Sequence, residues 1–266
     1  MVARIAARHL TAAARERVAE LLEVENNAQA VEEGMAAAAT WADEVRKDTG
    51  TESWHFLNLA WQDDRTNFKE RCENDDCVTA RVRLFTEQLQ ADDPDAETRF
   101  ADKDALRFLV HFVGDVHQPL HAANDADQGG NCEAVEGGVV DAANVHALWD
   151  GPLVTRMGLD SALLAAELDA EIADMSEGQR GDISAGEVED WAWDSHRLAM
   201  VNVYKRLNIP KEDVAFPEGC GEAPEEIQQT SVLVDDQYVA DMEPIVRAQL
   251  EKAALRLARV LNKISG

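Results

Sequence analysis

The sequence lacks the features that mark several large classes of protein. None of its 266 residues belongs to an apolar run of about 18 residues, the length needed to cross a membrane. No signal peptide is visible before the first amphipathic segment. Basic residues are few, with 25 lysines and arginines against 52 aspartates and glutamates, so the net charge is −27. This balance disfavours a protein that neutralises a polyanion with basic side chains, and we interpret most of the charge as a solvated acidic surface.

Cysteine is also scarce, and the four cysteines are not spaced as in a zinc ribbon, because none forms a C-x-x-C pair. An even count fits two disulfides in an oxidising compartment. Cys72 and Cys77 could close a local loop, which leaves Cys132 and Cys220 by elimination. Four free thiols in a cytosolic protein are the alternative. The disulfide interpretation conflicts with the missing signal peptide.

Strand signals are weak, because no long alternating run of β-branched residues occurs. Hydrophobic residues make up 45% of the chain and recur at helical spacing, so the sequence predicts an all-α, multi-helix fold in one domain over residues 1–266. Thr11 is expected to cap a helix. Residues 99–118 should be helical until Pro119 ends or kinks the helix. The stretch 122–140, rich in glycine and asparagine, predicts a loop or short hairpin.

Histidines are what the sequence does concentrate. Only seven occur, and five of them lie in three short segments, 54–58, 111–121 and 144–150, of which the last two also hold aspartates. His111 and Asp115 are four residues apart and would share one face of a helix. The same spacing recurs at His146 and Asp150. A buried His–Asp hydrogen bond would explain one such pair, but two pairs together with His121 indicate a metal site, for which imidazole and carboxylate ligands favour zinc.

Three neighbouring residues refine this interpretation. The bend at Pro119 would let His121 reach a different metal ion from His111. His117 would point away from the ligand face, and we expect it to support the site or to lie in the core. Arg46 lies three residues after Asp43, on the same helix face. This position suggests that its guanidinium binds an anionic substrate such as a phosphate. A solvent-exposed arginine paired with an acidic residue is the alternative.

Together these segments resemble the zinc-dependent S1/P1 nuclease family, of the phospholipase C/P1 nuclease fold. The likeness covers nearly the whole chain. It is carried by Trp41-Ala-Asp-Glu-Val-Arg46, Trp54-His-Phe-Leu-Asn58, His111-Phe-Val-Gly-Asp-Val-His-Gln-Pro-Leu-His121, Gly129-Gly-Asn131 and Asn144-Val-His-Ala-Leu-Trp-Asp150. Two later segments add to it, Trp193-Asp-Ser-His-Arg-Leu-Ala and Leu255-Arg-Leu-Ala-Arg-Val-Leu-Asn262.

The resemblance implies three zinc ions at the bottom of a cleft. One would be bound by Asp43, His55, His111 and Asp115, and a second by His121, His146 and Asp150. The third would share Asp115 and otherwise use an N-terminal tryptophan and a nearby histidine, which this sequence does not contain. We expect a start assigned too late, and hence a chain much less active than a longer one. A true variant with two zincs is the alternative.

The resemblance also implies the chemistry. A hydroxide on zinc would attack a phosphodiester, Arg46 would neutralise charge on the phosphoryl oxygens, Phe56 would stack a base, and Asn131 would hydrogen-bond it. Asn58 stands where fungal members have an aspartate, which puts a general-base role there in doubt. The expected substrates are single-stranded DNA and RNA, cut to 5′-phosphorylated products, and 3′-nucleotides.

We expect a monomer, secreted or periplasmic, without a membrane partner. Two other functions stay open. The first is a zinc-dependent phospholipase C, which shares the fold and the zinc set, although its last ligand is typically glutamate rather than Asp150. The second is a non-catalytic acidic metal-binding protein, which would have no need of Arg46 or Phe56.

Overall fold

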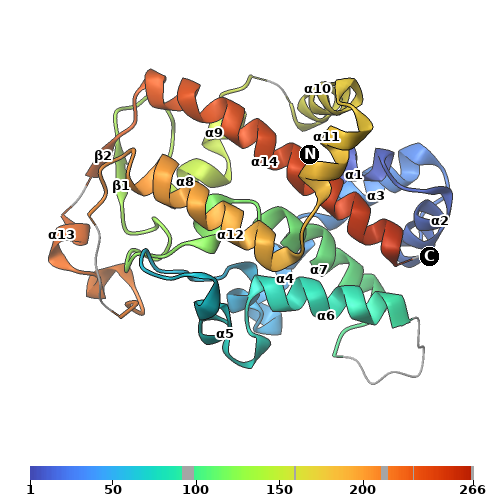
Figure 1. The fold of residues 1–266 in the computed structure, drawn as a ribbon, viewed down its shortest axis with the longest axis horizontal. Helices are drawn as coiled ribbons and strands as arrows, with labels where there is room; N and C mark the ends of the chain where they lie inside the picture. The colour runs from blue at the N-terminus through green and yellow to red at the C-terminus, as the bar shows by residue number, and fades with distance from the viewer. Residues whose placement is uncertain (92–98, 159, 211–214, 230, 265–266) are drawn as a thin grey trace.

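The computed structural model describes residues 1–91, 99–158, 160–210, 215–229 and 231–264, and it is built almost entirely of helices (Figure 1). The all-α prediction is therefore confirmed. The long helices are α1 (Val2–Arg8), α2 (Ala12–Leu22), α3 (Ala28–Ala38), α4 (Trp41–Thr49), α6 (Val78–Ala91), α7 (Asp102–Asp115), α10 (Ser161–Asp174), α11 (Glu177–Ser184), α12 (Val188–Leu198) and α14 (Asp236–Lys263).

Short elements connect these helices. They are the 3-10 turns η1 (Glu52–His55), η2 (Arg65–Asn67), η3 (Glu73–Asp75), η4 (Pro119–Ala122) and η6 (Cys220–Glu222), the π-helical turn η5 (Ala199–Tyr204), the short helices α5 (Phe68–Arg71), α8 (Val145–Asp150), α9 (Pro152–Thr155) and α13 (Glu225–Gln228), and two strands, β1 (Ala134–Glu136) and β2 (Ser231–Leu233).

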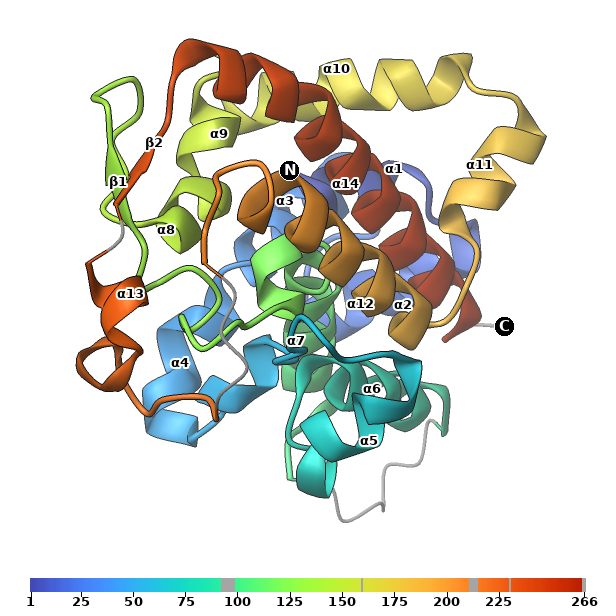
Figure 2. The same ribbon diagram turned by 60° about the vertical axis from the view of Figure 1, so that its left-hand side comes forward.

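Helix α14 runs the length of the molecule and packs against α1, α7 and α11, while α7 packs against α6 (Figures 1 and 2). Aromatic rings fill the space under α7: Trp54 meets Phe108 with ring centroids 5.7 Å apart, and Phe85 stacks on Phe108 at 5.2 Å. Burial of such rings contributes most of the stabilisation of a core. This cluster fixes α7 against the segment that contains η1.

Helix ends follow the sequence signals. The hydroxyl of Thr11 accepts a hydrogen bond from the backbone of Ala14 at 3.1 Å, so the predicted cap of α2 is confirmed. Helix α7 ends at Asp115, and Pro119 opens η4 as its first residue. Since proline cannot donate a backbone hydrogen bond, the chain turns here and sends His121 in a new direction.

The stretch 122–140 is mainly a loop, one of the two forms predicted for it, and its single short strand forms no hairpin within that stretch. Strand β1 pairs in parallel with β2, with Val135 opposite Val232, so its partner lies almost a hundred residues further along the chain. Three-residue strands are too short for a periodic signal, and a parallel pair has no turn to reveal it.

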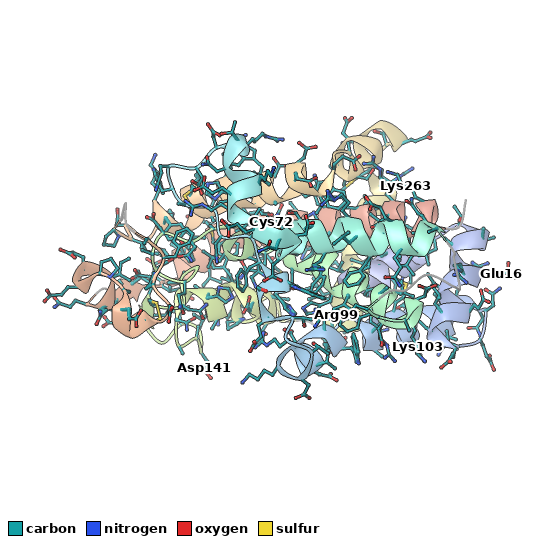
Figure 3. The ribbon with its side chains drawn as sticks, turned by 90° about the horizontal axis from the view of Figure 1, so that it is seen from below. Glu16, Cys72, Arg99, Lys103, Asp141 and Lys263 are labelled. Carbon is teal, nitrogen blue, oxygen red and sulfur yellow. A yellow bond between two sulfur atoms is a disulfide. The ribbon has the colours of Figure 1, made fainter. Side chains whose placement is uncertain are left out.

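Both expected disulfides are present, Cys72–Cys77 and Cys132–Cys220. The first closes a short loop between residues 72 and 77, where Figure 3 labels Cys72. The second joins two segments that are 88 residues apart in the sequence. Charged side chains such as those of Glu16 and Asp141 lie at the periphery in the same view, as expected for a solvated acidic surface. None of the helices in the described residues is both long and apolar enough to cross a membrane.

Candidate metal centre

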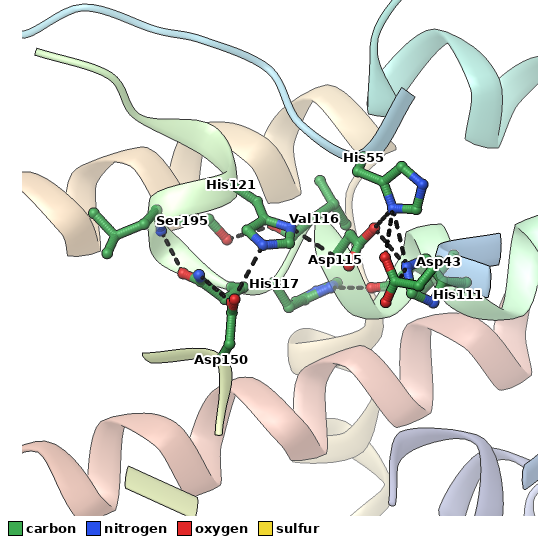
Figure 4. A network of polar contacts seen from close by, with 12 residues as sticks. Asp43, His55, His111, Asp115, Val116, His117, His121, Asp150 and Ser195 are labelled. Atoms are coloured by element: carbon green, nitrogen blue, oxygen red, sulfur yellow. Dashed lines mark hydrogen bonds and ion pairs between the residues drawn. The ribbon is translucent and has the colours of Figure 1, made fainter. Parts of the chain in front are cut away.

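A first group of predicted ligands comes from three helical elements. Asp43 lies on α4, His55 ends η1, and His111 lies on α7 (Figure 4). Nδ1 of His55 is 3.1 Å from Nε2 of His111, and these two nitrogens lie 3.6 and 3.7 Å from the two oxygens of Asp43. Such a triangle of nitrogen and oxygen atoms can hold a cation at its centre.

Asp115 joins this group to a second one. Its Oδ2 lies 3.0 Å from Nδ1 of His55 and 3.0 Å from Nε2 of His111. Its Oδ1 lies 3.4 Å from Nδ1 of His121, which the bend at Pro119 has turned towards it. The predicted separation of His111 and His121 into different clusters is therefore what the geometry shows.

The second group consists of His121, His146 and Asp150. Nε2 of His121 is 3.4 Å from one oxygen of Asp150, and Nε2 of His146 is 3.4 Å from the other. The two imidazole rings stack with centroids 5.1 Å apart. His146 and Asp150 are adjacent on one face of α8, as their spacing predicts. All seven predicted ligands therefore converge on one site in two groups.

Hydrogen bonds on the far side of the ligands set which atoms face the site. Nδ1 of His111 donates to the carbonyl of Ala39 at 2.6 Å, and Nδ1 of His146 donates to that of Gly129 at 2.8 Å. A carbonyl only accepts, so Nε2 is the nitrogen of each ring that faces the site, and it carries the lone pair whenever the imidazole is neutral. His55 lacks such support, because its Nε2 is buried without a hydrogen-bond partner.

The charges of the site favour a bound cation. Burial lowers the pKa of His111, but Asp115, the Ala39 carbonyl and Asp43 together outweigh burial and raise this pKa to about 9. Asp115 and Asp150 together raise the pKa of His121 to about 10 against the same effect of burial. For Asp115, burial is likewise opposed and exceeded by the two histidines, which hold its pKa well below the usual value. The electrostatic potential at these nitrogens is thus negative, and it stabilises a positive charge placed there.

Backbone contacts keep the ligand-bearing segments in register. The backbone amide of Leu57 donates to the carbonyl of His121 at 2.7 Å, which ties the segment after η1 to η4. The indole of Trp54, itself buried, donates to Asp76 at 2.5 Å. Because Trp54 is anchored in the aromatic core, the position of His55 beside it follows from core packing.

The other predicted site residues are spread more widely. Arg46 is half-exposed, lines the cavity above the ligands and donates to Asp43 Oδ1 at 3.1 Å, so its acidic partner is one of the ligands. Phe56 lines this cavity, of about 720 Å³, and a neighbouring one of about 680 Å³. Asn58 lines only the neighbouring cavity. Asn131 is exposed and lines neither; its side-chain amide donates to the carbonyl of Gln128.

Polar residues of α12 and α14 support the site from behind, and the sequence did not reveal them individually. His117 is buried in the core, as expected, with Nδ1 donating to the Val113 carbonyl and Nε2 accepting from Arg256 at 2.9 Å. Burial, then Arg256, lower its pKa to about 3. Ser195 donates to the Val116 carbonyl at 2.7 Å, and Gln249 donates to that of His117 at 2.8 Å. These contacts occupy the carbonyls freed where α7 ends.

The residues present fit zinc. Both groups offer imidazole nitrogen and carboxylate oxygen without thiolate, and their donor atoms lie within 4.8 Å of one another. The imidazoles of His111 and His146 are oriented by carbonyls, an arrangement usual for zinc-binding histidines. The cavity above leaves the outer side of the ligands open to a substrate.

The chain is similar to known nucleases along its whole length. The family model described as S1/P1 Nuclease matches residues 1–266. The chain is 27% identical over 276 residues to Endonuclease 2 of Arabidopsis thaliana, covering all of this chain and 88% of that protein. It is 28% identical over 245 residues to Endonuclease 5 of the same plant, covering 87% and 78%. It is 26% identical over 253 residues to Nuclease P1 of Penicillium citrinum, covering 87% and 85%.

Proposed function

Since the chain belongs to the S1/P1 nuclease family and is a nuclease by that membership, we propose that it is a zinc-dependent phosphodiesterase acting on single-stranded DNA and RNA. The products would carry 5′-phosphates, and the same site would dephosphorylate 3′-nucleotides. The observation that supports the proposal is the pair of His–Asp groups joined by Asp115.

The ligands would be used as their positions suggest. Asp43, His55, His111 and Asp115 would hold one zinc, and His121, His146 and Asp150 a second; a third, expected from the family, would share Asp115. Bound zinc supplies positive charge for the phosphate oxygens and makes water more acidic. The protein's own part is to fix the ligands and to exclude other orientations of the phosphate.

Arg46 and Phe56 would position the substrate. The guanidinium of Arg46 is half-exposed beside the ligands, where it can bind a phosphoryl oxygen and stabilise charge that grows during the reaction. Phe56 lies where the two cavities meet, so a base turned out of a flexible strand could stack on it. Stacking tolerates every base, and a duplex would have to unpair first, which favours single strands.

Net charge adds a constraint on affinity. A surface with a net charge of −27 repels nucleic acid, so binding would depend on the cations and Arg46 inside the cavity. The two disulfides indicate an oxidising compartment, and we propose a secreted or periplasmic monomer.

The test compares metal and substrate together. The protein is stripped of metal with a chelator, and zinc or magnesium is added back before assays on single-stranded DNA, RNA, a duplex of the same sequence, a 3′-nucleotide and phosphatidylcholine. We expect zinc alone to restore cleavage of both single strands and release of phosphate from the 3′-nucleotide.

Two other outcomes would identify the competing functions. Cleavage of phosphatidylcholine without cleavage of nucleic acid would indicate a phospholipase C. Tight zinc binding without hydrolysis of any substrate would indicate a non-catalytic metal-binding protein. The variant D141N changes an exposed aspartate at the periphery of the molecule that is not among the predicted ligands, and it serves as the control for every aspartate substitution.

A further inference from the structure

The loop between η4 and β1 buries three carboxyl groups outside the His–Asp site. Asp125, Asp127 and Glu133 have exposed fractions of 1%, 0% and 0%. Aspartate and glutamate are almost never fully buried unless they are paired or bind a metal ion. Carboxylates buried to this extent therefore need hydrogen-bond donors or a cation to compensate for the loss of solvating water.

Hydrogen bonds within the protein satisfy only some of the oxygens of Asp127 and Glu133. Oδ1 of Asp127 accepts hydrogen bonds from the hydroxyl of Tyr204 at 2.9 Å and from the backbone amide of Asp125 at 3.1 Å. The other oxygen, Oδ2, is buried and has no hydrogen-bond partner among the described residues, and the same is true of both oxygens of Glu133. The charge that acts most on Glu133 is that of Asp127, which has the same sign.

A proton would not resolve this arrangement. Burial, together with the nearby Asp127, raises the pKa of Glu133 to about 8, so a neutral carboxyl group is the obvious alternative. A protonated Glu133 would still bury a donor and an acceptor without partners, and Asp127 Oδ2 would remain unsatisfied. Each unmet group costs about 1–3 kcal/mol. The loop closes on itself through the hydrogen bond from the Cys132 amide to the Asp127 carbonyl at 3.0 Å, which brings Glu133 near Asp127, and a cation between their carboxylates would satisfy these oxygens together.

We propose that Asp127 and Glu133 bind a calcium ion at a site separate from the His–Asp centre, with loop carbonyls as further ligands. The donors are oxygens only, and the two carboxylates match the charge of a divalent ion. Calcium accepts six to eight oxygens in irregular geometry, whereas zinc prefers the nitrogen-containing groups elsewhere in the chain. The proposal holds whether or not those groups bind zinc.

The ion would stiffen the backbone that orients His146. The carbonyl of Gly129 accepts from Nδ1 of His146, and the carbonyl of Gly130 accepts from its backbone amide at 3.1 Å. Both glycines lie between Asp127 and Glu133. A side chain at Gly129 would come within 2.7 Å of the Leu120 carbonyl, so the loop already packs tightly against η4.

Binding is measured directly on the full chain, with zinc kept saturating so that the His–Asp groups are occupied. Calcium is removed by exhaustive exchange, because common chelators of calcium also remove zinc. Equilibrium dialysis with calcium counts the ions, and terbium then replaces calcium as a luminescent probe that nearby Tyr204 can sensitise. We expect one tightly bound calcium per chain, and a thermal midpoint raised by roughly 5–10 °C when calcium is at 100 times its Kd.

Variants assign the ion to the loop. E133Q and D127N should lose the tight calcium and the thermal shift, whereas E136Q, an exposed glutamate three residues further on, should keep both. Y204F should lower sensitised terbium emission. If either loop variant fails to fold, wild-type protein still decides, since no bound calcium and no thermal shift would overturn the proposal. Calcium binding that survives in a folded E133Q variant would overturn it too.

Discussion

Gln118 donates from its side-chain amide to Oδ1 of Asp150 at 2.8 Å and so connects the end of α7 to α8. The bond joins the His121 segment to the helix that holds the other two ligands of its group. Its oxygen also accepts from the backbone of Leu120 at 2.5 Å, so one side chain holds both η4 and a ligand.

Removal of this amide should loosen the second metal group. In Q118A, Asp150 loses a hydrogen bond that aligns its carboxylate, and we expect zinc affinity to fall about 10- to 100-fold. Excess zinc should restore most of the activity. Zinc competition with a chromophoric chelator measures the affinity. Q237A removes a surface amide–carboxylate contact on α14 and should leave it unchanged; an unchanged affinity in Q118A would contradict the role.

Substitution of Asp115 should affect both groups. D115N keeps the shape of the side chain but removes the charge that His55, His111 and His121 share. We expect zinc content to fall by at least one ion per chain and cleavage of single-stranded DNA to fall to near background. Elemental analysis and an initial-rate assay test this, with D141N as control. Full zinc content in D115N would show that Asp115 is not a ligand.

Arg46 should contribute to catalysis but not to metal binding. We expect R46A to lower kcat/KM about 10²- to 10³-fold, the usual effect of removing one donor to a developing negative charge, with zinc content unchanged. R46K should recover only part of the lost kcat/KM, because the lysine ammonium lacks the forked hydrogen-bonding geometry of a guanidinium. R83A, an exposed arginine on α6, is the control. Loss of zinc in R46A would mean that Arg46 acts by holding Asp43.

The two disulfides should differ in their effect on stability. Cys132–Cys220 spans 88 residues and Cys72–Cys77 spans 5, so chain entropy assigns them about 4.6 and about 2 kcal/mol of stabilisation. The double variant C132A/C220A should therefore unfold at lower denaturant than C72A/C77A. Urea unfolding monitored by circular dichroism measures both, and the reverse order would contradict the prediction.

Glu251 should make stability depend on pH. It is buried on α14 beside Glu171 and Arg247, with Glu167 also on that arginine. Burial, then Glu171, raise the pKa of Glu251 to about 7 from an ordinary 4.5. A raised carboxyl pKa means a stabilising contribution that is full below the ordinary pKa and is lost as the pH rises through 7.

The variant E251Q tests this pH-dependent contribution of Glu251 to stability. E251Q stays neutral, so its thermal midpoint should fall less than that of the wild type between about pH 5 and about pH 8. E243Q, on an exposed position of the same helix, should behave as the wild type. Equal slopes for wild type and E251Q would show that Glu251 does not titrate in this range.

Local signals in the sequence predicted much of the site. The spacing of His111 with Asp115, and of His146 with Asp150, requires only a helix to bring each pair together. The predicted bend at Pro119 depends only on the rule that proline does not continue a helix. The all-α class follows from periodicity in the same way. Such inferences are reliable because they depend on neighbours within one or two turns.

What could not be predicted depends on distant contacts. The contact of Arg256 with His117 joins residues 139 apart, and the pairing of β1 with β2 leaves no periodic trace. The burial of Asp127 and Glu133 is hidden for another reason, since acidic residues in a glycine-rich stretch suggest an exposed loop. Only the packing of Tyr204 and Cys220 against that stretch reveals its interior position.

The bond between Cys132 and Cys220 has a consequence for the cell that produces this protein. It fastens the end of the loop whose carbonyls orient His146. While the chain remains in a reducing cytosol, that fastening is absent and the His146 loop is free to loosen. On the proposed secreted or periplasmic localisation, the loop would be fastened only after export, and single-stranded RNA inside the producing cell would meet a nuclease whose His146 loop is not yet fixed.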